Sequence, residues 1–321
     1  MRPHATVPLF DAHCHLQEVM SGGEEELDAR VCEIRRQGCG GCVVNGTGPE
    51  DWGHVASLAR FSRAHGGMFR PAFGLHPWQV SGGTPLEGWV ERLRALLEEF
   101  PEAAIGEAGL DKAHILRHRI QHGEDAARAV FHSGGGDGVS RLLGREREVL
   151  AEQLRLAREL GRVVVLHCVR AFGTLETLLR ELPPPRGFLL HGYSGSPEQA
   201  RGFARMGGWF SFGPRNLSAT AGHAEFSPKT AAVLRAIPVG RVLLETDFPS
   251  GRAAFPASLP ELLAGHAHEL RRVHEAAARH FGLSLPVLGA RIHENHRELW
   301  EGMRRLGAGS SDQPPEPEAV Q

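Results

Sequence analysis

Histidine and acidic residues that could bind a metal stand at the ends of short apolar segments. The first group is Asp11, His13 and His15, where an apolar run stops at Asp-Ala-His-Cys-His. Side chains alternate along a β-strand, so these three should share one face. In a core each would need its own partner, whereas two imidazoles and a carboxylate together suit a divalent metal. The alternative is a helix-capping aspartate with surface histidines.

Five further apolar segments also end in histidine, glutamate or aspartate. Their terminal polar residues are His76, Glu107, His167, His191 and the pair Glu245 and Asp247. A single histidine at a strand end is usually a core histidine with a hydrogen-bond partner. Independent core histidines would have no reason to choose the same end of so many strands, and this pattern favours a metal centre.

The set of ligands fits two divalent cations, with zinc, manganese or magnesium as the expected metals. The candidate ligands are His13, His15, Glu107, His167, His191 and Asp247. Glu107 is expected to bridge the two ions, with the histidines of the first segment on one ion and those of the fifth and sixth on the other. Two such ions would activate a water, and Asp247 is the expected general base.

Eight short apolar segments alternate with longer amphipathic ones. The expected strands cover residues 7–10, 41–45, 69–73, 103–106, 162–166, 187–190, 208–212 and 242–244. The expected helices cover residues 25–37, 52–65, 86–99, 145–160, 174–182, 197–206 and 229–236, with two more at 262–282 and 286–303. This α/β alternation requires a mainly parallel sheet. Eight units favour a (β/α)8 TIM barrel over an open doubly wound sheet, whose glycine motif is missing.

The active site of such a barrel lies at the carboxyl ends of its strands. Residues 113–144 interrupt the alternation there and are expected to form an insertion after strand four. His114, His118 and His122 recur every four residues, but a solvated basic face or lid is favoured over a second metal site. The domain should span residues 1–306, followed by a small, polar and proline-rich tail, 307–321, that we expect to be disordered.

Composition argues against several classes of protein. The 321 residues carry a net charge of -2, so no overall positive field attracts nucleic acid or membranes. Five scattered cysteines argue against a disulfide framework, and a structural role is favoured for Cys39 and Cys42 over a redox or zinc pair. No segment reads as a signal peptide or a membrane span. We therefore expect a soluble cytoplasmic protein, a monomer or weak oligomer.

Six motifs in order resemble the TatD family of metal-dependent hydrolases, within the amidohydrolase-like superfamily. They are Asp11-Ala12-His13-Cys14-His15, Gly74-Leu75-His76-Pro77, Gly106-Glu107-Ala108-Gly109-Leu110-Asp111, Leu166-His167-x-x-Arg170, His191-Gly192-Tyr193-Ser194 and Glu245-Thr246-Asp247-Phe248-Pro249. The resemblance implies a TatD-like deoxyribonuclease that cleaves phosphodiester bonds of DNA by attack of metal-bound hydroxide. It implies the same six metal ligands, and places His76 beside the scissile phosphate with Arg170 as a second contact.

Departures from the family pattern lie over the expected barrel mouth. Lys112 and the insertion follow Gly-Leu-Asp, where the family often has an aromatic residue, and Lys112 could bind a phosphate chain. Loops select the substrate, so metal chemistry is better supported than DNA. The alternative is a related enzyme acting on an ester, lactone or amide, although such enzymes often bridge their metals with a carbamylated lysine rather than a residue like Glu107. A catalytically inert scaffold is least favoured, because every ligand type is present.

Overall fold

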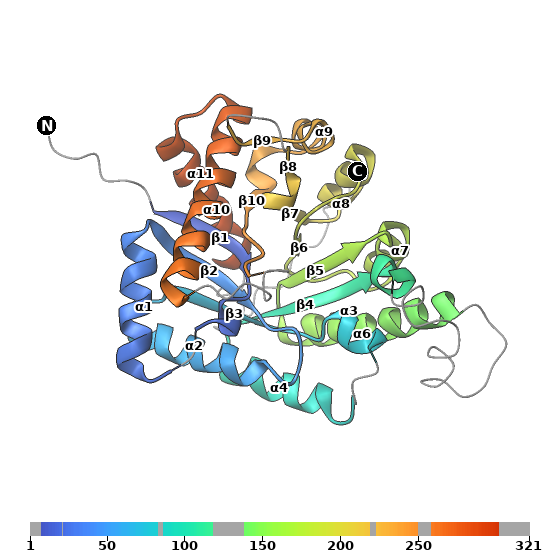
Figure 1. Ribbon diagram of the computed structural model, residues 1–321. Coiled ribbons are helices and arrows are strands. Elements are labelled where there is room, and N and C mark those ends of the chain that lie inside the picture. Colours follow the sequence, from blue (N-terminus) through green and yellow to red (C-terminus); the bar gives the residue numbers. More distant parts are fainter. Residues whose placement is uncertain are drawn as a thin grey trace, which may run out of the picture.

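Eight parallel strands form a nearly closed barrel with helices around it (Figure 1). The structure, a computed structural model, describes residues 8–20, 22–82, 86–117, 138–218, 223–249 and 258–301. The strands, in spatial order, are β1 (Leu9–Cys14), β2 (Cys39–Asn45), β3 (Phe69–Phe73), β4 (Ala104–Asp111), β5 (Val164–Val169), β6 (Phe188–Leu190), β7 (Gly208–Phe212) and β10 (Val242–Leu244). The predicted (β/α)8 TIM barrel is thereby confirmed.

Helices follow the strands around the outside of the barrel. They are α1 (Glu24–Arg36), α2 (Trp52–Ala64), α3 (Pro77–Ser81), α4 (Trp89–Glu99), α6 (Gly138–Leu160), α7 (Phe172–Glu181), α8 (Pro197–Arg205), α9 (Pro228–Ala236), α10 (Leu259–Phe281) and α11 (Leu285–Glu301). Short elements complete the described chain: a short helix at residues 112–117, the 3-10 turns η1 (Leu16–Glu18), η2 (Pro214–Asn216) and η3 (Val239–Arg241), and an antiparallel pair of β8 (Leu217–Ser218) and β9 (Glu225–Phe226). Local sequence sets where helix α8 begins, because Ser196 and Gln199 form a capping box at its start.

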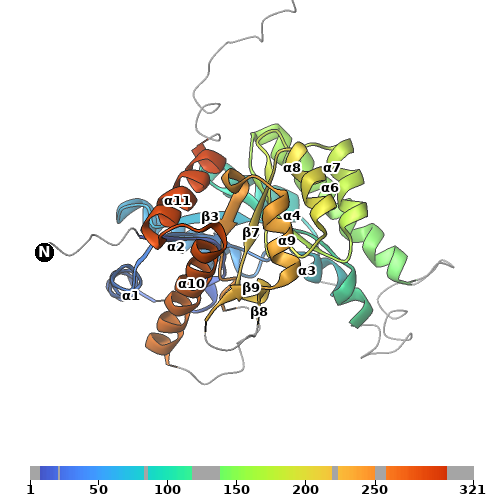
Figure 2. The same ribbon diagram turned by 90° about the horizontal axis from the view of Figure 1, so that it is seen from above.

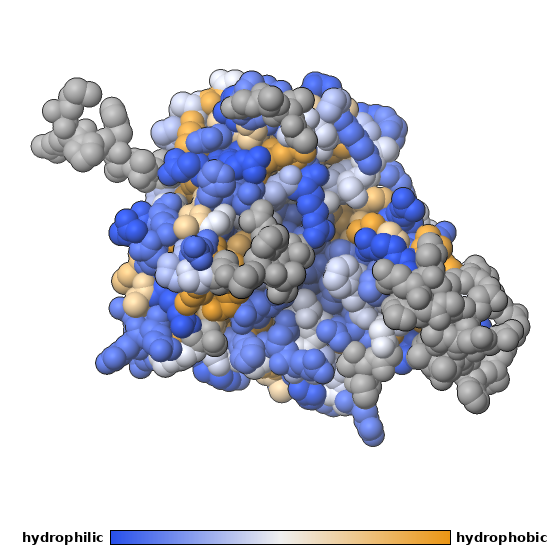
Figure 3. Space-filling model, viewed as in Figure 1, coloured by the Kyte–Doolittle hydropathy of each residue, from blue (hydrophilic) through white to orange (hydrophobic). Residues whose placement is uncertain are grey.

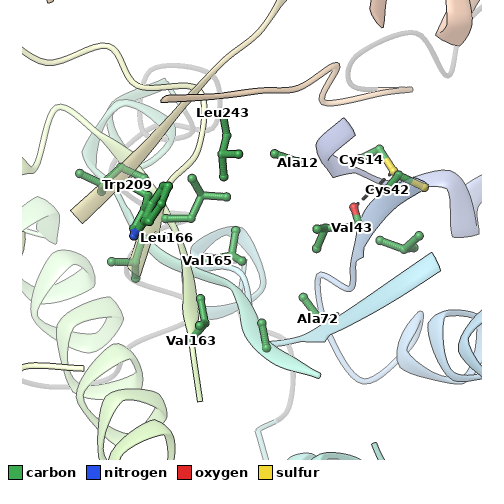
Figure 4. Close-up of a cluster of buried hydrophobic side chains, with 14 of the residues drawn as sticks. Ala12, Cys14, Cys42, Val43, Ala72, Val163, Val165, Leu166, Trp209 and Leu243 are labelled. Carbon is green, nitrogen blue, oxygen red and sulfur yellow. Dashed lines mark hydrogen bonds between the residues drawn. The ribbon is translucent and has the colours of Figure 1, made fainter. Parts of the chain in front are cut away.

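Buried apolar side chains from several strands form one cluster on the two faces of the barrel wall (Figure 4). The labelled group includes Ala12, Ala72, Val163, Val165, Leu166, Trp209 and Leu243, all buried. Branched side chains pack well on pleated strands, which is why the predicted segments rich in valine and leucine became the barrel wall. Cys14 donates a hydrogen bond from Sγ to the Val43 carbonyl at 3.3 Å and, with Cys42, packs as part of this core.

The barrel closes between its first and last strands. The Asp247 N–H donates to the His13 carbonyl at 2.9 Å, and the His15 N–H donates to the Phe248 carbonyl at 2.6 Å. Helices α10 and α11 lie next to each other beside β1 and β10 (Figure 1, Figure 2). The two C-terminal helices therefore cover the seam of the barrel from outside. The sequence predicted the two helices but not their place at the seam.

Strand β4 is longer than predicted. The expectation stopped at residue 106, but the strand continues to Asp111 and pairs with β5, with Ala108 opposite Leu166 and Gly109 opposite His167. Gly109 has a φ of 156°, and a Cβ there would lie 1.9 Å from the His167 carbonyl oxygen. Glycine at this position permits the close approach of the two strands, although in the sequence it looks like a turn.

The predicted insertion is shorter than expected. Residues 138–144 belong to α6, and residues 112–117 form a short helix directly after β4. His118 and His122 lie outside the described residues, as do the predicted domain end at residue 306 and the tail at 307–321. The favoured basic face or lid, and the less favoured second metal site, thus stay expectations that the described residues do not test.

The surface is mostly polar on the face shown in Figure 3, with small apolar patches. Among the described residues, the exposed large hydrophobic side chains are Trp78, at 45% exposure, and Val287, at 55%. In the described part of the chain, no helix has the length and apolar character needed to cross a bilayer.

Candidate metal centre

Seven polar side chains meet at the carboxyl end of the barrel. They are His13 of β1, His15 just after it, His76 after β3, Glu107 of β4, His167 of β5, His191 after β6 and Asp247 after β10. We refer to these seven as the polar cluster. Glu107 lies 3.2 Å from His13 and 2.8 Å from His191, measured between ligand atoms. Residues up to 234 positions apart in sequence, 13 to 247, are therefore gathered at one place by the parallel barrel.

The two carboxylate oxygens of Glu107 face different histidines. Oε2 lies 3.2 Å from His13 Nε2 and 3.3 Å from His15 Nε2. Oε1 lies 2.8 Å from both His167 Nδ1 and His191 Nε2. A carboxylate that joins two metal ions must present one oxygen to each, and Glu107 is placed in this way.

Asp247 approaches the His13 and His15 side of the cluster. Its Oδ1 lies 3.4 Å from His15 Nε2 and 3.7 Å from His13 Nε2, while Oδ2 lies 3.6 Å from an Arg215 guanidinium nitrogen. Its φ of 53° is in the left-handed region, which a residue with a side chain rarely adopts. Such strain often accompanies a functional constraint, and here it directs one carboxylate oxygen toward the histidines and the other toward Arg215.

The separations between these atoms fit a bound cation. Two ligand atoms at about 2.0–2.1 Å from one tetrahedral ion lie about 3.3 Å from each other. His13 Nε2 and His15 Nε2 are 3.3 Å apart, and both lie at nearly this distance from Glu107 Oε2. Two neutral imidazoles that both turn a lone pair to the same point repel each other, whereas a cation at that point binds both. The residues present therefore fit a divalent metal.

Contacts on the far side of two rings set which nitrogen faces the cluster. His15 Nδ1 lies 2.8 Å from the Asn45 carbonyl oxygen and must donate to it, so in the neutral ring, the form that binds a metal, Nε2 carries the lone pair. His167 uses Nε2 toward Asp111 Oδ2, at 3.2 Å, and turns Nδ1 toward Glu107. Metal-binding histidines are commonly oriented by such carbonyl and carboxylate partners.

His76 differs from the other four histidines of the cluster. Its Nδ1 accepts a hydrogen bond from the Trp78 backbone N–H at 3.1 Å, and burial lowers the pKa of His76 to about 4. The neutral ring must then carry its proton on Nε2, which lies 3.1 Å from Glu107 Oε1. A protonated nitrogen donates a hydrogen bond and does not bind a metal, so the ring suits contact with an anionic group.

Both carboxylates of the cluster are held in the ionised form. Burial raises the pKa of Glu107, but the surrounding histidines, His191 first, outweigh burial and lower this pKa well below its usual range. The pKa of Asp247 is also lowered, because the hydrogen bond from His15 and the neighbouring histidines outweigh its burial. Ionised carboxylates are the form needed to bind a cation or to accept a proton.

Asp11 does not join the cluster, contrary to expectation. Its Oδ2 accepts from Thr246 Oγ1 at 2.6 Å and lies 2.8 Å from His266 Nε2, while Oδ1 accepts from the Thr246 N–H at 3.0 Å. The pairing of β1 with β2 is irregular between Asp11 and Cys14, so the side chains there do not alternate strictly between the two faces of the strand. The carboxylate instead ties β1 to the segment that carries Asp247.

The predicted substrate contacts are not gathered as closely. Arg170 is exposed and Lys112 is half-buried, and among the described residues no hydrogen bond or ion pair joins either to the polar cluster. A cavity beside the cluster is lined by His167, His191, Asp247 and Arg215. Sequence reasoning missed Arg215 because it searched strand ends for metal ligands. The Gly-Pro-Arg that follows the seventh strand was the available signal.

Comparison with known proteins agrees with this geometry. The sequence profile of the family described as TatD related DNase matches residues 10–301. The chain is 30% identical over 245 residues to the uncharacterized metal-dependent hydrolase YjjV of Escherichia coli, which covers 75% of this chain and 79% of that protein. It is 29% identical over 236 residues to the 3'-5' ssDNA/RNA exonuclease TatD of Cronobacter sakazakii, covering 70% of this chain and 73% of that protein. The crystal structure of E. coli YjjV matches with a TM-score of 0.66 and 26% identity, over 91% of this chain and 98% of that chain.

Proposed function

Because the chain belongs to the family of TatD-related DNases, which are metal-dependent hydrolases, we propose that it hydrolyses phosphodiester bonds in single-stranded or damaged DNA. The observation that carries the proposal is Glu107, whose two oxygens face separate groups of histidines, Oε2 the pair of the first strand and Oε1 those of the other strands. Nucleases and phosphatases commonly use two ions about 3.5–4 Å apart. The exonuclease name of the Cronobacter relative supports a nucleic acid substrate.

The proposed metal ligands are the six residues named from sequence. His13, His15 and Asp247 would hold one ion, His167 and His191 the other, with Glu107 between them. Zinc, manganese and magnesium are the proposed metals, given imidazole together with carboxylate ligands. When bound, two such ions supply Lewis acidity, which makes a water more acidic and neutralises phosphoryl charge.

Asp247 acts as general base in this proposal. Its carboxylate is ionised and Asp247 lines the cavity, where it would accept a proton from the attacking water. The water oxygen then bonds to phosphorus as the ester P–O bond breaks, and the leaving alcohol takes up a proton. Asp247 is thus both ligand and base, through different oxygens.

Two side chains are placed to hold the phosphate. His76 carries its proton on Nε2 and would donate it in a hydrogen bond to a phosphoryl oxygen. Arg215 lines the cavity with His167 and His191 and would contact a second oxygen. Arg170 and Lys112, the contacts implied by sequence, are proposed only for more distant parts of the substrate.

Metal content and substrate preference together test the proposal. Glu107→Gln should lose about half or more of the bound divalent metal and nearly all activity, since the bridging charge is removed. Glu102→Gln is the matched control, because Glu102 pairs with Arg63 on the surface at 2.8 Å. The purified protein would be assayed with bis(p-nitrophenyl) phosphate, a single-stranded oligonucleotide and a panel of lactones. Hydrolysis of lactones alone, or unchanged metal content in Glu107→Gln, would overturn it.

A further inference from the structure

Trp78 is exposed at the edge of the polar cluster. It lies in α3, two residues after His76, and 45% of its surface is accessible. Its ring centroid lies 5.0 Å from that of His76 and 6.3 Å from that of His167. Tryptophan is enriched at interfaces, because its large ring is apolar while its N–H can bond a partner.

Trp78 is held in one orientation. Its indole N–H donates to Asp111 Oδ2 at 2.7 Å, and its ring stacks on His114 with centroids 4.9 Å apart and planes inclined by 22°. The ring also meets His76 edge to face, with an interplanar angle of 85°. An aromatic ring that is both fixed and exposed loses little conformational entropy when it binds a ligand.

We propose that Trp78, backed by His114, is a stacking platform for the nucleobase next to the cleaved phosphate. The inference rests on the proposed function and names the part of the substrate that determines specificity. Base stacking on aromatic side chains tolerates any base, because every base has a π-face. Bases in a duplex already stack on their neighbours, so the platform selects single-stranded nucleic acid over double-stranded.

The location of the platform follows from its neighbours. His76, whose Nε2–H is directed toward Glu107, is in ring contact with both Trp78 and His167 of the cluster. A phosphate bound by His76 would bring the adjoining nucleoside close to Trp78. The neighbouring rings are therefore placed to bind two parts of one nucleotide, His76 the phosphate and Trp78 the base.

Paired substrates separate base recognition from a general effect on the site. A thymine hexamer and a hexamer of abasic tetrahydrofuran units have the same phosphodiester backbone, and only the first has bases. Trp78→Ala should lower kcat/KM for the thymine hexamer by about 5- to 150-fold more than for the abasic hexamer. Trp78→Phe should restore most of the preference for the thymine hexamer, because phenylalanine keeps an aromatic ring. It has no indole N–H to donate to Asp111, so recovery would show that the ring itself is what matters.

A matched control is Val287 of α11, the other large hydrophobic side chain that is exposed in the described part of the chain. Val287→Ala should leave the ratio of the two rates unchanged. Equal slowing of both hexamers by Trp78→Ala would mean that the indole only orients Asp111, and the platform would be overturned. Equal rates of wild-type cleavage for the thymine and abasic hexamers would overturn it as well.

Tryptophan fluorescence gives a readout that needs no catalysis. The other four tryptophans, Trp52, Trp89, Trp209 and Trp300, are at most 8% exposed, so iodide quenching should report mainly on Trp78. A phosphorothioate thymine hexamer, which resists cleavage, should protect the wild-type protein from iodide and leave Trp78→Phe unaffected. Absence of protection would overturn the platform. Protection without cleavage of any phosphodiester would keep the platform but overturn the proposed hydrolysis.

Discussion

The two sides of Glu107 are supported in different ways. On one side, which we call the seam side, His13, His15 and Asp247 are tied together by main-chain hydrogen bonds where β10 meets β1. On the other, the rim side, His76 and His167 lie against Trp78 of α3, and His167 also contacts Asp111 at the end of β4. Barrel closure and the buried Asp11 contacts stabilise the seam side, whereas side-chain contacts shape the rim side.

This difference suggests a division of tasks. The seam side is covered by α10, whose His266 reaches the Asp11 carboxylate, and both of those side chains are fully buried. The rim side holds the exposed Trp78 and the half-buried His114. A rigid seam suits metal binding and proton transfer, while an accessible rim suits substrate contact.

The largest expected effect tests whether the seam side carries the chemistry. Asp247→Asn should lower kcat by about 100- to 10,000-fold, the usual contribution of general acid–base catalysis, because the amide cannot accept the proton. Steady-state kinetics on bis(p-nitrophenyl) phosphate would measure the loss, with thermal unfolding to check that the fold is intact. Asp28→Asn, an exposed change on α1, is the control. Near-normal turnover in Asp247→Asn would remove the base from the proposal.

Stability should differ between the two sides. Asp11→Ala should lower the free energy of unfolding by about 3–5 kcal/mol, because it leaves buried partners such as His266 and Thr246 unpaired. His114→Ala on the rim side should cost only about 0.5–1.5 kcal/mol, the value of an aromatic contact. Urea unfolding of both variants measures the contrast. Equal losses would show that the two sides are supported alike.

Acid should weaken the helix that covers the seam. His274 of α10 is buried and donates from Nδ1 to the Leu270 carbonyl, and burial lowers the pKa of His274 to about 4. The unfolded chain takes up this proton near pH 6.5, but the folded chain does not until about pH 4. The contribution of His274 to the free energy of unfolding is therefore complete above pH 6.5. It is lost as the pH falls toward 4, by about 3 kcal/mol.

His274→Asn should remove that part of the pH dependence, since the amide can still donate to the carbonyl but does not titrate. Urea unfolding at pH 7 and at pH 5 would measure the change in slope. His65 makes the same kind of bond to the Phe61 carbonyl at 2.9 Å but is less buried, so His65→Asn is the matched control. An unchanged slope in His274→Asn would show that other groups cause the acid sensitivity.

Much of the architecture could be predicted because it depends on local patterns. Short runs of valine, leucine and phenylalanine bounded by polar turns matched strands such as β3, β7 and β10 over their full length. Long helices such as α2 and α10 were also found, from apolar residues at helical spacing. The extension of β4 to Asp111 was missed, because it depends on pairing with β5 and not on local preference.

The polar cluster was accessible to sequence reasoning for a similar reason. Parallel strands point the same way, so their terminal residues meet at one rim wherever a barrel closes. The place of Asp11 was misjudged, because an irregularity in the pairing of β1 with β2 sets it. Arg215 was missed, because the path of a loop brings it to Asp247. Neither feature leaves a periodic trace in the chain.

The order of apolar and polar residues by itself determined the eight-stranded barrel, the seven residues of the polar cluster and the family to which the chain belongs. Tertiary structure alone decided which oxygen of Glu107 faces which histidines, that His76 presents a proton rather than a lone pair, and that Trp78 is fixed at the rim. The physical reason is one of range. Burial and periodicity act through neighbours along the chain, whereas tautomers and hydrogen-bond partners depend on atoms that only folding brings within about 3 Å.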